Sequence, residues 1–433
     1  MTPGSMRSRL VATVGAGMVR QRRPRVVIVG AGFGGLWAVK ALRKAQVDVE
    51  LIDRHNYHTF FPLLYQVAAA ELAPGDIAHP IRKIIRRQRN VRFTLATVIG
   101  IDTENRLVLT DATPRPYDYL VLAVGSTTRY FDVPGADAHS YPLRTLQDAI
   151  DLRNHILTCF EVAERRAAEP GGAELTFVVV GGGPTGVEFS GALQELVNGP
   201  LAKDHPRLEV ATTRVVLVES GERLLPIYPD RLSTYAMRRL RRMGVEVRLG
   251  TTVNRVDRGF VQLGSGEKIE AATVVWTAGV GGPGELSRWG LATGRSGRAV
   301  VRPDLTVTGC EGVFVVGDSS EPIGTGSPTV AQNATQQGTL AAGNVIRAME
   351  GRPLKPYRYR DLGNMAVIGR NAAIVHLFGR IGFKGYPAWL LWLALHLAKL
   401  VGFRNRIAAV LSWSGDYLFR DRVARVITSE AVD

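Results

Sequence analysis

The sequence predicts an α/β protein that contains two nucleotide-binding units of the same kind, one after the other. Two observations carry this prediction. Two glycine-rich turns each follow an apolar strand and open a helix, and in each case the next strand ends at an acidic residue. A chain of 433 residues is long enough for two or three domains. Its 45% hydrophobic content and its 47 glycines fit a globular enzyme better than a disordered or repeat protein.

The formal charge of +15 is concentrated at the two ends of the chain. Residues 1–24 form a basic N-terminal extension, and the last eighty residues carry many arginines among aromatic side chains. No nucleic-acid-binding motif accompanies either stretch, so we expect no nucleic-acid partner. Only Cys159 and Cys310 are present, far apart, which excludes a close redox pair and a thiolate metal site. The interior suits a reducing cytosol.

The first nucleotide-binding unit begins with the apolar strand VVIV. Gly30, Gly32, Gly34 and Gly35 follow it, then a stretch with helical periodicity, then a strand that ends at Asp53. Such glycines permit a tight turn, close approach of the backbone to a pyrophosphate, and close packing of helix on strand. The helix N-terminus faces the phosphate charge, and the carboxylate accepts the ribose hydroxyls. The alternative is a purely structural glycine turn.

The same pattern returns at residues 176–219. The strand TFVVV leads to Gly181, Gly183 and Gly186, a helix follows, and the strand RVVLV ends at Glu219. A carboxylate here favours NADH over NADPH because it repels a 2′-phosphate. Arg223, close by in sequence, weakens that preference.

Three further apolar strands end where the chain would turn beside a bound nucleotide. They end near Gly125, Gly279 and the Gly-Asp pair that contains Asp318. The order of the motifs predicts a flavin domain interrupted by a nicotinamide domain. We therefore expect an FAD-binding domain (25–150 and 300–345), an NADH-binding domain (151–299) and a C-terminal domain (346–433).

This arrangement resembles the two-dinucleotide-binding flavoproteins, which share a glutathione-reductase-like fold. The resemblance implies that Asp318 hydrogen-bonds the ribityl part of FAD. The alternative for Asp318 is a helix cap or turn acid. In such enzymes a hydride passes from the nicotinamide to the flavin and the electrons then go to a second acceptor.

Three segments resemble the type II NADH dehydrogenases, single-subunit NADH:quinone oxidoreductases that do not pump protons. They are HTFFPLLYQVA (58–68), PTVAQNATQQG (328–338) and the tail GYPAWLLWLALHLAKLVGFRNRIAAVLSW (385–413). The second matches the family pattern A-Q-x-A-x-Q. The resemblance implies FAD and NADH as cofactors and a membrane quinone, menaquinone or ubiquinone, as the acceptor.

The resemblance also implies roles for particular residues. Ala331 and Gln332 would lie against the isoalloxazine ring and Gln336 would line the quinone site. Glu188 corresponds to a carboxylate that the family places near the flavin and quinone, where a raised pKa would let it relay a proton. The alternatives are that Glu188 orients the nicotinamide or pairs with a base, and that Gln336 is a solvent-facing amide.

The tail is expected to lie on a membrane. Fourteen residues between Lys384 and Lys399 carry no acidic or basic side chain other than His396, which is too short a run to span a bilayer. The apolar side chains after residue 407 recur near helical spacing. The flanking residues expected to reach anionic head groups or the interface are Arg404, Arg406, Arg420, Arg422, Arg425, Trp389, Trp392 and Trp413.

This predicts a peripheral protein on the cytoplasmic face of the cell membrane, bound to its anionic surface. The alternative is a core or homodimer-interface helix pair. Rival functions are a reductase of another acceptor, a sulfide:quinone oxidoreductase, which would need paired cysteines, and a redox-sensing flavoprotein.

Overall fold

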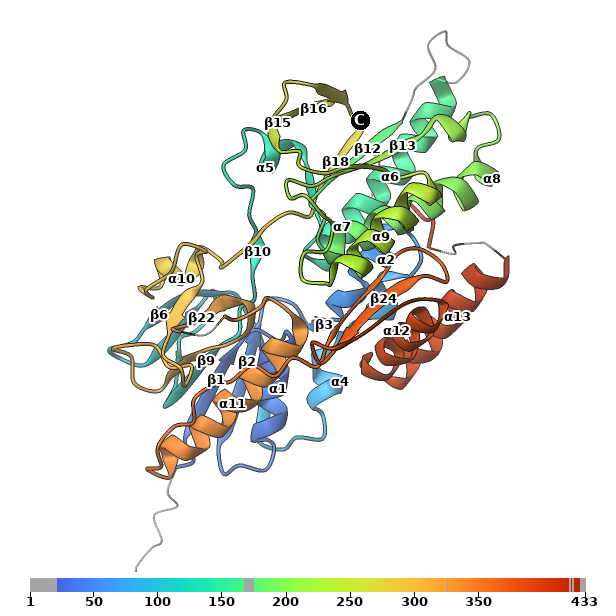
Figure 1. Cartoon of the computed structure of the whole chain (residues 1–433). Helices are drawn as coiled ribbons and strands as arrows, with labels where there is room; N and C mark the ends of the chain where they lie inside the picture. Colours follow the sequence, from blue (N-terminus) through green and yellow to red (C-terminus); the bar gives the residue numbers. More distant parts are fainter. Residues whose placement is uncertain (1–21, 167–174, 325, 420–421, 423, 429–433) are drawn as a thin grey trace, which may run out of the picture.

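The computed structural model of the protein describes residues 22–166, 175–324, 326–419, 422 and 424–428. The backbone of α13 is described to residue 419, but the side chains of 416–419 are not. Nearly all of the predicted extension 1–24 lies outside the described residues, as does Arg420. Two five-stranded parallel sheets form the centres of two units (Figure 1). The predicted α/β fold class with two Rossmann-type units is confirmed.

The first sheet has the strand order β21-β9-β1-β2-β5, and all neighbours are parallel. Its strands are β1 (Arg25–Val29), β2 (Asp48–Asp53), β5 (Val91–Leu95), β9 (Tyr119–Leu122) and β21 (Val313–Val315). Helices α1 (Phe33–Leu42) and α11 (Ala331–Met349) lie side by side along it. They approach closely because glycines face each other: a Cβ on Gly338 would lie 2.1 Å from Gly34 O.

The second sheet has the order β11-β18-β12-β13-β14. Its strands are β11 (Tyr141–Pro142), β12 (Thr176–Val180), β13 (Arg214–Val218), β14 (Glu246–Arg248) and β18 (Thr273–Trp276). The long helices of this unit are α6 (Leu146–Arg166), α7 (Pro184–Leu196) and α9 (Asp230–Met243). The short strands β10 (Thr127–Thr128) and β19 (Val280–Gly281) pair antiparallel where the chain crosses between the units (Figure 1).

Shorter elements complete both units. Those before residue 140 are β3 (Tyr57–Thr59), α2 (Leu64–Ala68), α3 (Pro74–Ile77), β4 (Ala78–Pro80), α4 (Ile81–Ile85), β6 (Val98–Asp102), β7 (Leu107–Thr110), β8 (Arg115–Pro116) and α5 (Ala136–His139). The later ones are a π-helical turn (Val197–Leu201), α8 (Ala202–Asp204), β15 (Val253–Asp257), β16 (Phe260–Leu263), β17 (Lys268–Glu270), α10 (Glu285–Arg288), β20 (Ala299–Val301) and β22 (Ser320–Pro322).

The C-terminal region contains more than the predicted helices. An antiparallel sheet of β23 (Asn364–Val367), β24 (Ala373–Leu377) and β25 (Ile381–Gly385) precedes α12 (Tyr386–Lys399) and α13 (Phe403–Phe419). The sequence analysis did not predict this sheet. Within the described residues, no helix combines the length and apolar character needed to cross a bilayer.

Two residues of the tail were assigned wrongly to the membrane surface. Trp392 is 2% exposed and belongs to the large core cluster that includes α7, and Arg422 is also 2% exposed. Trp413 is partly buried, and its indole donates to Gln66 Oε1 (3.0 Å). The tail is amphipathic, and its inner face is part of the protein core.

Candidate functional site

The carboxyl edge of the first sheet brings together the residues predicted to bind FAD. Gly30, Gly125 and Asp318 follow the neighbouring strands β1, β9 and β21, and parallel strands end at the same edge. A Cβ on Gly35 would lie 1.8 Å from Gly30 O, whereas one on Gly32 would meet nothing within 4 Å. The turn is therefore closed on its protein side and open where a pyrophosphate would lie.

Two carboxylates flank this turn. Asp53 accepts the backbone N–H of Ala31 (2.6 Å) and of His55 (2.7 Å), so it braces the turn as well as facing the nucleotide position. Asp318 forms an ion pair with Arg144 (2.6 Å) and accepts from Ser126 Oγ (3.0 Å). The sequence analysis missed Arg144. It precedes α6 and links the second unit to the Gly-Asp loop of the first.

The second turn repeats this geometry. A Cβ on Gly186 would lie 1.9 Å from Gly181 O, and one on Gly183 would meet open space. Glu219 accepts the N–H of Gly182 (2.5 Å) and of Gly221 (2.6 Å). Gly279 follows β18, which lies beside β12 in the sheet.

Arg223 is held within its own loop. Its guanidinium pairs with Asp230 and donates to Pro226 O (2.8 Å). It is therefore occupied in the arrangement observed, which favours the preference for NADH predicted from Glu219.

The glycine turn of the first unit and its two flanking carboxylates form a site that fits FAD on chemical grounds. The helix α1 carries no acidic residue in its first turn, so nothing there opposes a pyrophosphate at its N-terminus. Asp53 and Asp318 each keep 17% of their side chain exposed, which leaves acceptor atoms for hydroxyl groups. Bound FAD supplies the centre that takes a hydride from NADH and passes two electrons on.

The A-Q-x-A-x-Q segment forms the start of α11, with Ala331 as its first residue. Gln332 Nε2 donates to Gly363 O (3.1 Å), and its Oε1 accepts from Leu362 N–H (3.2 Å). Gln336 Nε2 donates to Arg360 O (2.9 Å) and its Oε1 accepts from Arg360 N–H (3.0 Å). Both amides thus hold the irregular segment that leads into β23.

Two further amides of the same helix contact the Gly-Asp loop and the segment around Tyr357. Gln337 is fully buried and its Oε1 accepts from Gly317 N–H (2.6 Å) and Ser320 Oγ (2.8 Å). Asn333, also buried, accepts from Tyr357 Oη (2.5 Å). The i, i+4 spacing of two amides beside Gln332 and Gln336 was the signal in the sequence that could have identified them.

Glu188 lines a cavity of about 50 Å³ where the two units and the C-terminal region meet. Its walls come from α2, α7, the β23–β24 turn, α12 and α13, and they include Tyr65, Gln66, Glu71, Glu195, Arg370, Trp389, Trp392 and Trp413. The space is room for a few water molecules rather than for a quinone ring. Gln336 is not among the lining residues.

The surroundings of Glu188 favour its protonated form. Burial raises the pKa of Glu188 to about 8, the N–H of Val367 (3.2 Å) opposes this, and the charge of Glu71 adds to it. Burial and the charge of Glu188 also raise the pKa of Tyr65 well above its usual value. At neutral pH the cavity therefore holds a carboxylic acid and a phenol, both able to donate.

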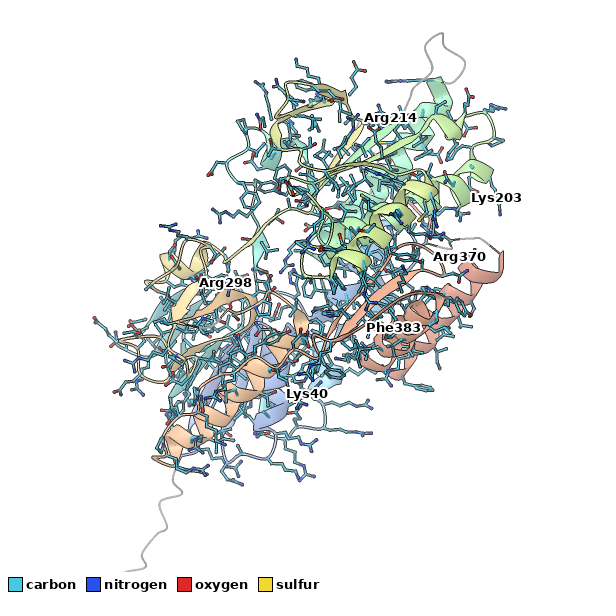
Figure 2. All side chains as sticks on the ribbon, viewed as in Figure 1. Lys40, Lys203, Arg214, Arg298, Arg370 and Phe383 are labelled. Carbon is cyan, nitrogen blue, oxygen red and sulfur yellow. The ribbon has the colours of Figure 1, made fainter. Side chains whose placement is uncertain are left out.

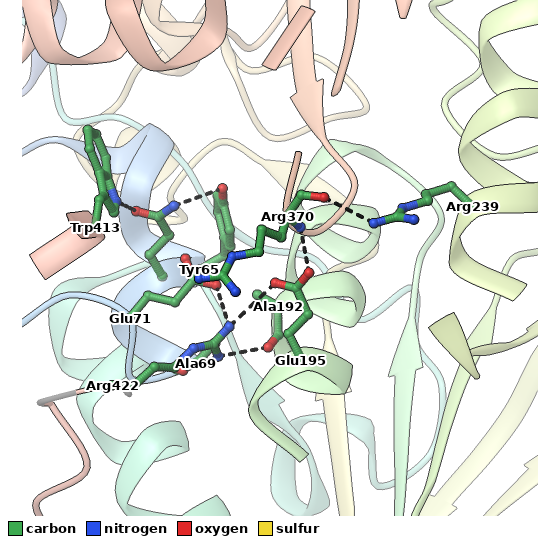
Figure 3. A network of polar contacts seen from close by, with 10 residues as sticks. Tyr65, Ala69, Glu71, Ala192, Glu195, Arg239, Arg370, Trp413 and Arg422 are labelled. Carbon is green, nitrogen blue, oxygen red and sulfur yellow. Dashed lines mark hydrogen bonds and ion pairs between the residues drawn. The ribbon is translucent and has the colours of Figure 1, made fainter. Parts of the chain in front are cut away.

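Arg422 joins both units beneath this cavity (Figure 3). Its guanidinium donates to Ala69 O (2.8 Å) and Ala192 O (2.9 Å). It also pairs with Glu71 (2.9 Å) and with Glu195 (3.6 Å). A charge with several partners at short distance is satisfied in the interior, which explains why this arginine is buried rather than in contact with lipid.

Family profiles match most of the chain. The pyridine nucleotide-disulphide oxidoreductase profile matches residues 24–338, and the NDH2 C-terminal domain profile matches residues 362–421. The type II NADH:quinone oxidoreductase NdhA of Mycobacterium tuberculosis is 41% identical over 95% of this chain and 90% of its own length. A second such enzyme of that organism, Ndh, is 39% identical over 94% and 91%.

Solved structures show the same fold. NDH2 from Plasmodium falciparum in complex with NADH superposes with a TM-score of 0.84 at 18% identity, covering 94% of this chain and all of that one. The sulfide:quinone oxidoreductase of Aquifex aeolicus gives 0.72 at 18% identity, covering 92% and 96%. At 41% identity over nearly the whole chain, the chain belongs to the type II NADH:quinone oxidoreductases, flavoenzymes that use FAD and NADH to reduce a quinone.

Proposed function

We propose that Glu188 supplies protons to the quinone during its two-electron reduction. Reduction of a quinone to a quinol consumes two protons, and a buried acid that is still protonated at neutral pH is suited to donate one. The observation that supports this role best is the cavity at Glu188. It has room for water molecules and is lined by residues of α7 and of the C-terminal region. In this assignment Gln336 lines the quinone site outside this cavity, and its amide holds the segment that leads to Val367.

One cofactor is assigned to the glycine turn of each unit. FAD lies along Gly30, Gly32, Gly34, Gly35, Asp53, Gly125 and Asp318, with Ala331 and Gln332 towards its ring. NADH lies along Gly181, Gly183, Gly186, Glu219 and Gly279. The open space at Gly32 and at Gly183 supports both proposed binding sites. The domain limits 25–150 with 300–345, 151–299 and 346–433 stand as part of this proposal, and β11 and the start of α6 lie just before residue 151.

The proposal places the protein on the cytoplasmic face of the membrane, where NADH is available. The family is membrane-associated. Exposed apolar side chains on α12 and α13 support a peripheral attachment, among them Tyr386 (50% exposed), Leu390 (44%) and Leu411 (66%). Burial lowers the pKa of His396 to about 4, so α12 carries no charge between Lys384 and Lys399.

Stopped-flow measurement of the two half-reactions tests the role of Glu188. In the Glu188→Gln variant, flavin reduction by NADH should keep its rate while reoxidation by a menaquinone or ubiquinone analogue slows. Equal effects on both half-reactions, or no effect on either, would remove the role. Flotation with anionic vesicles at low salt tests the attachment. A homodimer that covers the same apolar face would instead stay at the bottom of the gradient.

A further inference from the structure

Within the described residues, two of the tail arginines expected to bind lipid, Arg422 and Arg425, pair with carboxylates of the protein, and a third, Arg406, is exposed but bound to backbone carbonyls. Arg422 is buried, Arg406 donates to the last carbonyls of α12, and Arg425 pairs with Asp204 (2.7 Å). Of the tail arginines with described side chains, Arg404 and Arg406 are exposed, and the charge of Arg404 opposes the burial that raises the pKa of Asp76. If the protein attaches to an anionic surface, exposed cations outside the tail would add to this reduced charge.

A basic segment in the first unit offers them. Residues 82–92, from α4 to β5, contain six cations, and no acidic residue lies between Asp76 and Asp102. The cations are Arg82, Lys83, Arg86, Arg87, Arg89 and Arg92. All six are exposed, and within the described residues none forms an ion pair. Arg82 packs over the ring of Phe93, at 5.2 Å.

This basic segment adjoins the beginning of α13. Asn405 is buried and donates to Ala78 O (3.0 Å) in β4, the strand that runs directly into α4. Gly402 packs against His79, because a Cβ there would lie 2.4 Å from the imidazole. Lys83 is close enough to His79 for its charge to help burial lower the pKa of that imidazole. Figure 1 shows α4 beside the C-terminal helices, although 300 residues of sequence separate them.

An apolar ridge starts at the same place. Phe403 (78% exposed), Ile407 (46%) and Leu411 (66%) are four residues apart along α13 and therefore lie on one face of the helix. A row of large exposed apolar side chains next to a dense group of cations is the pattern of a surface that binds a lipid interface.

We propose that the basic segment 82–92 and the apolar ridge of α13 form one composite surface that binds an anionic phospholipid leaflet, with the basic segment supplying most of the electrostatic attraction. The inference rests on the proposed peripheral attachment and names its headgroup-binding part. Phosphate groups complement the cations, and acyl chains receive the side chains of the ridge. A nucleic acid would also attract the cations, but it has no use for the exposed ridge beside them.

The test is flotation of the FAD-loaded full-length protein with vesicles of phosphatidylcholine alone or mixed with phosphatidylglycerol, over a salt series. The variant Lys83→Gln, Arg86→Gln, Arg87→Gln, Arg89→Gln removes four exposed cations. Its affinity for anionic vesicles should fall by about a hundredfold or more at low salt, since each basic residue near an anionic leaflet contributes a factor of about five. Its salt dependence should flatten.

A matched control removes four exposed cations from the second unit: Arg165→Gln, Arg166→Gln, Arg258→Gln and Lys268→Gln. Figure 2 shows that unit, marked by Lys203 and Arg214, at the end of the molecule away from Lys40 of the first unit. The net charge changes equally, so the control should keep most of its vesicle affinity. The variant Phe403→Ser, Leu411→Ser should bind more weakly without losing its salt dependence.

The outcomes separate the two claims. If the wild type fails to float with anionic vesicles, the peripheral attachment itself is wrong. If the wild type floats and the two four-residue variants bind equally well, attachment stands and the role of the basic segment is overturned. If the basic-segment variant loses binding to a single-stranded RNA probe but keeps its vesicle affinity, the cations belong to a nucleic-acid site and the proposal is also overturned.

Discussion

The two nucleotide-binding units have nearly the same turn but carry different residues seven positions after its first glycine. Counting from the first glycine of each motif, Trp37 in α1 occupies the position that Glu188 occupies in α7. Trp37 is partly exposed and Lys40 lies over its ring at 3.6 Å. Glu188 lines an internal cavity and has a pKa of about 8. The same backbone arrangement thus forms only a proposed nucleotide-binding turn in the first unit. In the second unit it also presents an acid to the cavity.

The residue three positions further explains how this difference arises. The first unit has Lys40 there, and the second has Gly191, where a Cβ would lie 3.0 Å from Gly369 N. The glycine lets the β23–β24 turn pack on α7 and brings the Val367 N–H to Glu188. The proposed site for proton transfer is therefore built by the approach of the C-terminal sheet to one of two otherwise similar helices.

The largest expected effect comes from filling the open side of one turn at a time. A Cβ at Gly32 would meet no protein atom within 4 Å, so in Gly32→Val the fold should persist while pyrophosphate is excluded. FAD binding should weaken by about 3 kcal/mol or more, about a hundredfold in Kd. Gly183→Val should instead retain FAD and raise the KM for NADH. Flavin absorbance of the purified variants is the readout. A fully flavinated Gly32→Val protein would contradict the proposal that FAD binds at this turn.

Removing Arg422, which contacts both units, should have nearly as large an effect, here on the free energy of unfolding. Arg422→Met leaves Glu71 and Glu195 without this cation, and breaking a buried ion pair costs about 3–5 kcal/mol. Denaturant unfolding should show this loss, and Arg404→Met on exposed α13 should show almost none. Equal stabilities of the two variants would mean that Arg422 does not join the units.

Glu188→Gln should slow quinone-dependent flavin reoxidation by about 10²–10⁴, the range for loss of a general acid. Flavin reduction by NADH should change little. The matched control is Trp37→Phe, at the equivalent position of the first unit, which should leave both half-reactions nearly intact. A large effect of Trp37→Phe on reoxidation would break the contrast between the helices.

The pH dependence follows from the raised pKa of Glu188. The protonated acid is the donor, so wild-type reoxidation should be constant below about pH 8 and decline above it. The same shift makes the folded protein bind the proton more tightly than the unfolded chain, so stability falls as pH rises from about 4.5 to 8. Glu188→Gln should abolish the decline in reoxidation. An unchanged pH profile in that variant would assign it to another group.

The units were predictable because their signals are local. Strand, glycine turn, helix and terminal acid lie within a few dozen residues, and the resemblance identified the family, which the comparisons confirm. The cavity was predictable only through Glu188. Its other walls come from residues 65–71, 367–370 and 389–413, and no spacing rule connects such distant segments.

The tail shows where periodicity misleads. The pattern correctly indicated amphipathic helices, but it assigned Arg422 and Trp392 to the membrane because arginine and tryptophan are typical of that interface. Their burial depends on the carbonyls of Ala69 and Ala192 and on the packing of α12 against β24 and β25, which are tertiary contacts. For the same reason, truncation at Lys384 would remove part of the core and is no clean test of attachment.

The smallest expected effect concerns the two acids that end the second strand of each unit. Glu219 and Asp53 both accept two backbone N–H groups around their turn, so each has a structural role in addition to its proposed contact with the ribose. Glu219→Gln keeps an acceptor but removes the charge that repels a 2′-phosphate. It should raise the KM for NADH by about tenfold or less, the value of one or two hydrogen bonds, and it should relax discrimination against NADPH.

Asp53→Asn should leave the KM values for both nicotinamides unchanged and weaken FAD binding by a similar factor. Steady-state kinetics with both nicotinamides, together with FAD titration, measure this. If wild-type protein uses NADPH as well as NADH, or if Asp53→Asn alters nicotinamide choice, then the acids do not divide the two cofactors between the units.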